Sequence, residues 1–218
     1  MSFIPYQREF VSQTEMLKRS KQYFEEMNLR RSLRKFSPQS VDKDIIGNII
    51  ITASTAPSGA HKQPWTFCAV SDPLLKKEIR NAAEKEEKIN YSGRMSESWI
   101  EDLEPFGTDW QKPFLEVAPW LIVLFKKSYN ILPDGSKKKN YYVTESVGLA
   151  AGFLLNAIHQ SGLVALTHTP SPMNFLEKIL GRPENEKAFL LIPVGYPADD
   201  AEVPDLKRKS LEEIAVFY

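Results

Sequence analysis

The sequence predicts an α+β fold in which helices flank a small mixed sheet. Short uncharged runs such as residues 119–125 are typical of buried strands, and apolar residues at helical spacing separate these runs. A chain of 218 residues with 42% hydrophobic content can fill one core of moderate size. We therefore expect a single domain over residues 1–218.

The elements follow from capping residues and periodicity. Asp42 and Asp44 place acids in a first helical turn, where the macrodipole favours them, and Asp72 with Pro73 starts another helix. A third helix is apolar on nearly every side over residues 147–155, which places it at the centre or at a subunit interface. The predicted helices are residues 12–28, one from 42, one from 72, 141–161 and 175–180; the predicted strands are 65–70, 119–125, 163–167 and 188–196.

Composition excludes several classes of protein. Lys+Arg and Asp+Glu balance at 28 each, so nucleic acid is not an expected partner. A single cysteine, Cys68, and three widely separated histidines show no metal-ligand spacing, so no metal site is expected. The sequence has neither a signal-peptide pattern nor an apolar run that could cross a bilayer. We expect a cytoplasmic protein that does not enter membranes.

Two stretches carry polar chemistry close to flexible backbone. Arg30, Arg31, Ser32 and Arg34 crowd one short window, and arginine binds phosphate in a bidentate manner. Taken by itself, such a window is more often a solvated basic loop. Residues 52–65 form a second stretch, in which small residues between prolines let the backbone approach a ligand closely.

A charged segment near the middle of the chain has the composition of a lid. Residues 84–112 combine many charges with large apolar side chains, and such a segment either folds over a ligand or forms an ordinary pair of surface helices. The large side chains are Tyr91, Met95, Trp99, Phe106 and Trp110.

Common catalytic motifs are absent from the sequence. There is no G-x-G-x-x-G fingerprint, no P-loop and no G-x-S-x-G elbow, which argues against a Rossmann nicotinamide site, nucleotide triphosphate hydrolysis and serine esterase chemistry. The remaining basic, hydroxyl and aromatic side chains suit a flat anionic cofactor that carries the chemistry itself.

Several motifs together resemble the FMN-binding nitroreductases, and in particular their iodotyrosine deiodinase branch in its soluble form. The resemblance extends over nearly the whole chain from about Gln22. The basic window and the Gly-Tyr-Pro segment are shared by many nitroreductases, whereas the lid and the Thr169 motif are more specific. The motifs lie at residues 30–34, 56–65, 166–170, 180–183, 193–197 and 203–209.

The resemblance implies a nitroreductase-like fold, an intertwined homodimer with exchanged terminal segments, and FMN reduced by NAD(P)H or another reductant. It assigns FMN contacts to ten residues, with the Pro57 and Ser58 contacts usually made to the partner subunit's flavin. These residues are Arg30, Arg31, Ser32, Arg34, Pro57, Ser58, Thr167, His168, Thr169 and Arg208. This chain departs from the resemblance at His168, a position where branch members have threonine.

The implied reaction is the reductive dehalogenation of halotyrosine to tyrosine and halide. Ala60 matches the residue whose backbone N–H faces the substrate phenolate, and the Thr169 hydroxyl matches the hydrogen-bond donor to flavin N5. Glu87, Tyr91 and Lys112 match the lid residues that hold the amino-acid zwitterion. Glu87 accepts from the α-ammonium, while Tyr91 and Lys112 donate to the α-carboxylate.

Three alternatives remain open on the sequence. The chain could be a general FMN nitro- or quinone reductase whose lid serves other aromatic compounds. It could also be a flavin-bound sensor that captures tyrosine-like ligands without turnover. A basic-loop interaction module without flavin is the third alternative.

Overall fold

A computed structural model describes residues 2–218, which divide into two compact units at Arg31. The first unit contains helix α1 (Gln13–Asn28), which begins where the Ser12 side chain accepts the Glu15 N–H at 3.3 Å. The helix agrees with the predicted one over residues 12–28. Most of its apolar residues, among them Leu17 and Phe24, are exposed.

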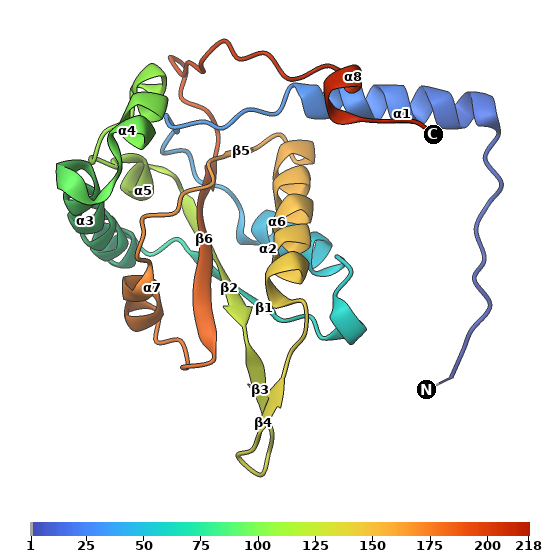
Figure 1. Cartoon of the computed structure of the whole chain (residues 1–218), viewed down its shortest axis with the longest axis horizontal. Helices are drawn as coiled ribbons and strands as arrows, with labels where there is room; N and C mark the ends of the chain where they lie inside the picture. The colour runs from blue at the N-terminus through green and yellow to red at the C-terminus, as the bar shows by residue number, and fades with distance from the viewer. Residues whose placement is uncertain (1) are drawn as a thin grey trace. The chain divides into compact units, whose positions relative to one another are not determined.

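The second unit, Ser32–Tyr218, is built on a four-stranded sheet in the order β1-β2-β6-β5 (Figure 1). Neighbouring strands are antiparallel, and a parallel bridge between Ser32 and Ala165 makes the sheet mixed at its edge. A separate hairpin joins β3 and β4. The strands are β1 (Trp65–Val70), β2 (Trp120–Lys127), β3 (Tyr129–Ile131), β4 (Lys137–Lys139), β5 (Val164–Ala165) and β6 (Glu186–Gly195).

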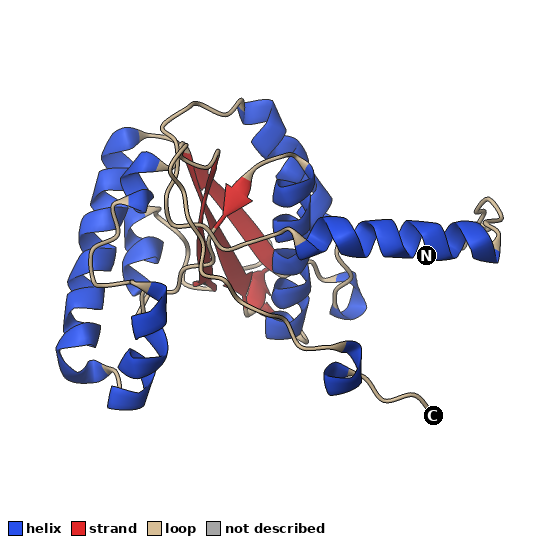
Figure 2. Ribbon diagram, turned by 90° about the horizontal axis from the view of Figure 1, so that it is seen from above, coloured by secondary structure: helices blue, strands red, loops and turns tan. Residues whose placement is uncertain are grey.

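Helices cover both faces of this sheet, as Figure 2 shows. Helices α2 and α6 pack on one face, and α3, α5 and α7 pack on the other. The helices of this unit are α2 (Lys43–Ser54), α3 (Pro73–Ile89), α4 (Glu97–Leu103), α5 (Phe114–Val117), α6 (Val143–Gln160), α7 (Asn174–Ile179) and α8 (Leu211–Ile214). Shorter helical turns lie at Gly59–His61, Asn90–Arg94 and Glu104–Phe106.

The central strand β2 explains the layering. Its side chains alternate between the two faces, so Leu121 and Val123 meet α3, α5 and α7, while Ile122 meets α2 and α6. All three are fully buried. Burying one such side chain contributes about 1.5–3 kcal/mol, so a continuous apolar strand is stable only between two covered faces.

The fold agrees with the predicted α+β class, with differences at some element ends. The predicted strand 163–167 is shorter, because only Val164–Ala165 pair with β6 as a strand. Beyond it, His168 still bridges to Leu191 and holds the chain extended. The last strand begins at Glu186, two residues before the predicted start.

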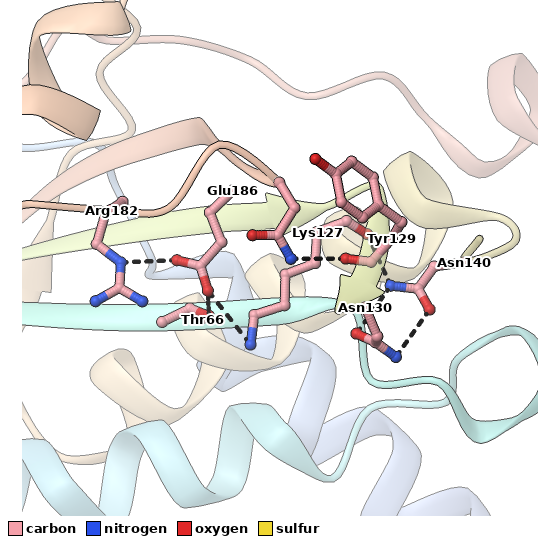
Figure 3. A network of polar contacts seen from close by, with 8 residues as sticks. Thr66, Lys127, Tyr129, Asn130, Asn140, Arg182 and Glu186 are labelled. Carbon is pink, nitrogen blue, oxygen red and sulfur yellow. Dashed lines mark hydrogen bonds and ion pairs between the residues drawn. The ribbon is translucent and has the colours of Figure 1, made fainter. Parts of the chain in front are cut away.

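A polar network fixes one end of the sheet (Figure 3). The buried Glu186 carboxylate accepts hydrogen bonds from Thr66 and Arg182 at 2.7 Å each, and the Lys127 ammonium lies 3.3 Å away. Burial opposes ionisation of Glu186, but these hydrogen bonds and the Lys127 charge outweigh burial and lower its pKa. The network ties β1, β2 and β6 together at this end of the sheet.

Helix α6 leaves part of its apolar surface uncovered. Val147, Ala150 and Leu154 are buried against the sheet, whereas Leu149 and Phe153 are 49% and 41% exposed. A helix that is apolar on nearly every side therefore buries only one stripe within a single chain.

Candidate active site

The candidate site is a cavity of about 210 Å³ between the predicted lid and the chain that follows β5. Its wall combines cationic, hydroxyl and aromatic side chains, which suits a planar ligand with polar edges. The lining residues are Arg34, Glu87, Tyr91, Met95, Trp99, Leu103, Thr108, Lys112, Phe114, Leu166, Thr167, His168 and Thr169.

Arg34 reaches the cavity because its segment runs along the sheet edge. Leu33 is buried and its N–H donates to the Ala165 carbonyl at 3.2 Å, which fixes the backbone beside β5. The Arg34 guanidinium lies 5.7 Å from the Phe106 ring centroid of the lid. Burial lowers the pKa of Arg34, but an arginine starts so high that it stays charged at neutral pH.

The segment after β5 presents two hydroxyls on one side. Backbone bonds between His168 and Leu191, at 2.9 and 3.0 Å, hold the segment extended. Residues two apart on an extended chain share a face, so Thr167 and Thr169 both project from the same side, and both are exposed.

His168 occupies the position between these threonines. Its ring contacts Phe114 edge-on with centroids 5.6 Å apart, and its Nε2 atom is buried without a hydrogen-bond partner among the described residues. Burial, followed by the charges of Lys112 and Arg34, lowers the pKa of His168 to about 3. The imidazole is therefore neutral at physiological pH.

The lid brings Lys112 to two predicted residues, Glu87 and Tyr91, that lie more than 20 positions before it in the sequence. Lys112 Nζ lies 3.3 Å from Glu87 Oε2, and their side chains are only 4% and 7% exposed. The same ammonium lies 5.5 Å from the Tyr91 ring centroid, and it donates to Thr108 Oγ1 at 3.3 Å and to the Asp109 carbonyl. The cavity wall thus contains a preformed pair of opposite charges beside a phenol.

Tyr91 remains a hydrogen-bond donor across the physiological range. Its hydroxyl donates to the Thr108 carbonyl at 3.2 Å. Burial raises the pKa of Tyr91, and the Glu87 and Asp109 charges act in the same direction. The phenol therefore stays protonated where a ligand carboxylate needs a donor.

The lid is also bonded directly to the segment that carries the threonines. Asn90 Nδ2 and Arg94 Nη1 donate to the Ser171 carbonyl at 3.0 and 3.1 Å. Arg94 further pairs with Glu86 at 2.9 Å. Sequence reasoning missed Asn90 and Arg94, because their partner lies about 80 residues away and no local pattern reports it.

The loop containing Ala60 has an unusual backbone. Ala60, His61 and Gln63 have φ values of 48°, 53° and 44°, which side chains with a Cβ rarely adopt. The Ser58 hydroxyl stabilises the turn by accepting the Gln63 N–H at 2.9 Å. Strain of this kind is maintained where a backbone group must point in a set direction.

The structure brings seven of the predicted site residues to the cavity wall. These are Arg34, Glu87, Tyr91, Lys112, Thr167, His168 and Thr169. Ser32, Pro57, Ser58, Ala60 and Arg208 also belong to the second unit, but they do not line the cavity of the single chain. Arg30 and Arg31 belong to the first unit.

The described residues contain neither a metal-ligand cluster nor a membrane-spanning helix. Residues 2–218 contain no group of three or more His, Cys, Asp or Glu side chains that could hold a metal ion. Over the same residues, no helix combines the length and the hydropathy that crossing a bilayer requires.

Comparison with known proteins decides the family. The nitroreductase family model matches residues 28–196, which include the cavity and the whole sheet. The chain belongs to the nitroreductase family. A family member from Haliscomenobacter hydrossis, named iodotyrosine deiodinase, is 64% identical over 217 residues, which cover 100% of this chain and 98% of its own length.

More distant relatives agree with this placement in the iodotyrosine deiodinase branch. Human iodotyrosine deiodinase 1 is 47% identical over 214 residues, covering 98% of this chain and 74% of its own. A solved structure of oxidized iodotyrosine deiodinase bound to FMN and 3-iodo-L-tyrosine superposes with a TM-score of 0.76 at 29% identity. That superposition covers 89% of this chain and 100% of the solved one.

Proposed function

We propose that this chain is an FMN-dependent oxidoreductase that reductively dehalogenates halotyrosines. The observation that carries the proposal is the buried Glu87–Lys112 pair beside Tyr91, in the wall of a cavity that also displays Thr167 and Thr169. One half of the cavity suits an amino-acid zwitterion, and the other half suits the polar edge of a flavin. The iodotyrosine deiodinase relatives support the same assignment.

The residues on the flavin side fit FMN. The isoalloxazine ring presents carbonyl and nitrogen acceptors along one edge, and the Arg34 guanidinium and the two threonine hydroxyls are donors. When bound, FMN supplies the electrons for the reaction, and NAD(P)H or another reductant restores them. In this proposal Thr169 donates to flavin N5, while Arg30, Arg31, Ser32 and Arg208 hold the phosphate and ring.

Substrate binding replaces the contact between Glu87 and Lys112 by contacts from each of them to the ligand. Without ligand, Glu87 and Lys112 neutralise each other at 3.3 Å. A zwitterion offers Glu87 an ammonium and offers Lys112 and Tyr91 a carboxylate, so each buried charge keeps an opposite partner in the complex. The closed lid also excludes water from the reacting ring.

The net reaction replaces iodine by hydrogen on the aromatic ring. The carbon–iodine bond breaks, iodide leaves, and the ring carbon takes one proton and two electrons to form a carbon–hydrogen bond. The protein's part is to bind the phenol as its phenolate, which the Ala60 N–H stabilises in this proposal, and to align the ring on the flavin.

We further propose that the active unit is a homodimer. A cavity of about 210 Å³ is smaller than the roughly 300–1,000 Å³ of typical ligand sites, so one chain does not enclose a cofactor and a substrate. The exposed Leu149 and Phe153 on α6 supply an apolar surface for a second copy. The partner's loop would then bring Pro57, Ser58 and Ala60 to the cavity.

A cytoplasmic location without nucleic-acid or membrane partners fits the balanced charge.

Iodide release tests the proposed function. Purified protein loaded with FMN is reduced with dithionite and mixed with 3-iodotyrosine, and tyrosine and iodide are quantified. We expect both products in equal amounts and in amounts that exceed the enzyme. A flavoprotein that reduces nitroaromatics or quinones but releases no iodide is a general nitroreductase instead. One that binds iodotyrosine without any turnover is a sensor.

A further inference from the structure

One face of α3 carries a stripe of polar side chains that bind the chain where the lid ends, at residues 112–118. Lys76, Arg80, Glu84 and Glu87 follow at spacings of four, four and three residues, which places them on one side of the helix. Only Glu87 at the cavity end of this stripe has a role in the proposed function. The other three contact residues 112–118, the stretch by which the lid returns to the core.

The buried end of the stripe holds this return stretch to the helix. Lys76 Nζ donates to the carbonyls of Glu116 and Ala118 at 2.9 and 2.8 Å. Arg80 Nη1 donates to Glu116 Oε2 at 2.6 Å. These contacts connect α3 to α5 and the residue after it, and none of them involves residues 84–112.

Glu84 makes a contact of a different kind. Its Oε1 accepts from Arg80 Nε at 2.7 Å and also from the backbone N–H of Lys112 at 2.7 Å. The first contact is an ordinary pair one turn apart on a helix, but the second joins residues 28 positions apart. The Glu84 side chain is only 16% exposed, so water competes little for either bond.

Helix α3 therefore holds Lys112 both at its backbone and at the tip of its side chain. Glu84 binds its main-chain N–H, and Glu87 lies 3.3 Å from its ammonium. The Lys112 carbonyl accepts the Leu115 N–H at 3.1 Å, which fixes the next peptide unit as well. A long flexible side chain reaches a defined point only when its Cα is fixed, and these bonds fix it.

We propose that Glu84 is a positioning residue for substrate recognition, which sets the place of the Lys112 ammonium and thereby selects ligands that carry an α-carboxylate. The inference rests on the proposed function, since it takes Lys112 as the carboxylate partner. Glu84 itself touches neither substrate nor flavin. Glu84 acts on the substrate only indirectly, because it binds the Lys112 backbone N–H. The same carboxylate also pairs with Arg80.

Three variants separate positioning from general stability. Glu84→Ala removes the acceptor for the Lys112 N–H, whereas Glu84→Gln retains an acceptor oxygen at the same place. Glu116→Ala is the matched control, because it removes the other carboxylate of Arg80 and leaves the bond to Lys112 intact. Each protein is loaded with FMN, and its flavin retention and melting temperature are measured first.

Ligand titrations followed by flavin fluorescence then use three probes. 3-Iodotyrosine carries both α-groups, 3-(4-hydroxy-3-iodophenyl)propionate carries the carboxylate alone, and 2-iodophenol carries neither. We expect Glu84→Ala to weaken binding of the two carboxylate ligands about tenfold, the effect of losing one hydrogen bond to a charged group. Binding of 2-iodophenol is expected to stay within twofold. Glu84→Gln should recover most of the loss, and Glu116→Ala should resemble wild type.

Two results overturn the inference while leaving the proposed function intact. If wild type binds 3-iodotyrosine and Glu84→Ala binds it equally well, Glu84 does not position Lys112. If Glu84→Ala weakens all three probes alike, Glu84 merely supports the lid. Failure of the wild type to bind 3-iodotyrosine refutes the proposed function, and the inference falls with it.

Discussion

Replacing Glu87 by Gln should destabilise the protein through the charge that it leaves behind. Lys112 is 4% exposed and lies 3.3 Å from the Glu87 carboxylate. At that separation two unit charges attract by about 5 kcal/mol at an effective dielectric constant of about 20. In Glu87→Gln, Lys112 retains neutral acceptors, namely the new amide oxygen, the Thr108 hydroxyl and the Asp109 backbone carbonyl.

Breaking a buried pair from one side costs about 3–5 kcal/mol, and the remaining acceptors place Glu87→Gln at about 2–3 kcal/mol. Lys112→Met removes the other charge and should cost a similar amount. In the double variant no charge is left unpaired, so its loss should be smaller than the sum of the two single losses by about 1.5 kcal/mol or more.

Urea unfolding followed by tryptophan fluorescence measures these losses, at one protein concentration and with saturating FMN so that binding contributes equally. Glu101→Gln makes the same change at an exposed position of α4 and should stay within about 0.5 kcal/mol of wild type. Single losses that add to within about 0.5 kcal/mol in the double variant would refute the buried pair.

Three further changes give distinct outcomes. Thr169→Ala should still bind halotyrosine but release iodide at least about tenfold more slowly and gain nitroreductase-like two-electron activity, for loss of one hydrogen bond to the flavin; unchanged dehalogenation removes Thr169 from that role. The pKa of His168 is lowered to about 3 in the folded chain, against about 6.5 when unfolded, so the unfolded state binds the proton first and stability falls as pH drops through this window. His168→Gln should therefore lose about 1–2 kcal/mol less than wild type between pH 6.5 and 5 in urea unfolding, and equal losses would contradict the neutral buried ring. A Cβ added at Gly195 would lie 2.5 Å from Pro119 Cδ, so Gly195→Ala should lower stability by about 1–3 kcal/mol, whereas Gly47→Ala in α2, where the space is open, should not.

The fold could be predicted largely because most of its helices and strands are marked by local sequence signals. β2 is an uninterrupted apolar run, and α2 and α3 begin at Asp42 and Asp72, whose side chains accept the backbone N–H of Asp44 and Leu75. Each signal needs only a few neighbouring residues. Where pairing with a distant strand determines an element's end, as at β5, the sequence predicted the end less well.

The site was predictable in part, and for a different reason. Glu87 and Tyr91 are one helical turn apart, so their shared face follows from spacing. That Lys112 pairs with Glu87 inside a buried wall, and that Glu84 binds the Lys112 backbone, depends on how residues 90–112 fold back onto α3. No local pattern encodes that return, and the resemblance to a family supplied Lys112 where periodicity could not.

Titration of the flavin fluorescence with ligands tests the central claim, which is that this lid binds an amino-acid zwitterion next to FMN. The same FMN-loaded protein is titrated with 3-iodotyrosine and with 2-iodophenol, which shares the ring, the hydroxyl and the iodine. We expect saturable quenching by both, with 3-iodotyrosine binding about 100-fold more tightly or better through its contacts to Glu87, Tyr91 and Lys112. Equal affinities for the two ligands, or a protein that binds no FMN, would contradict it.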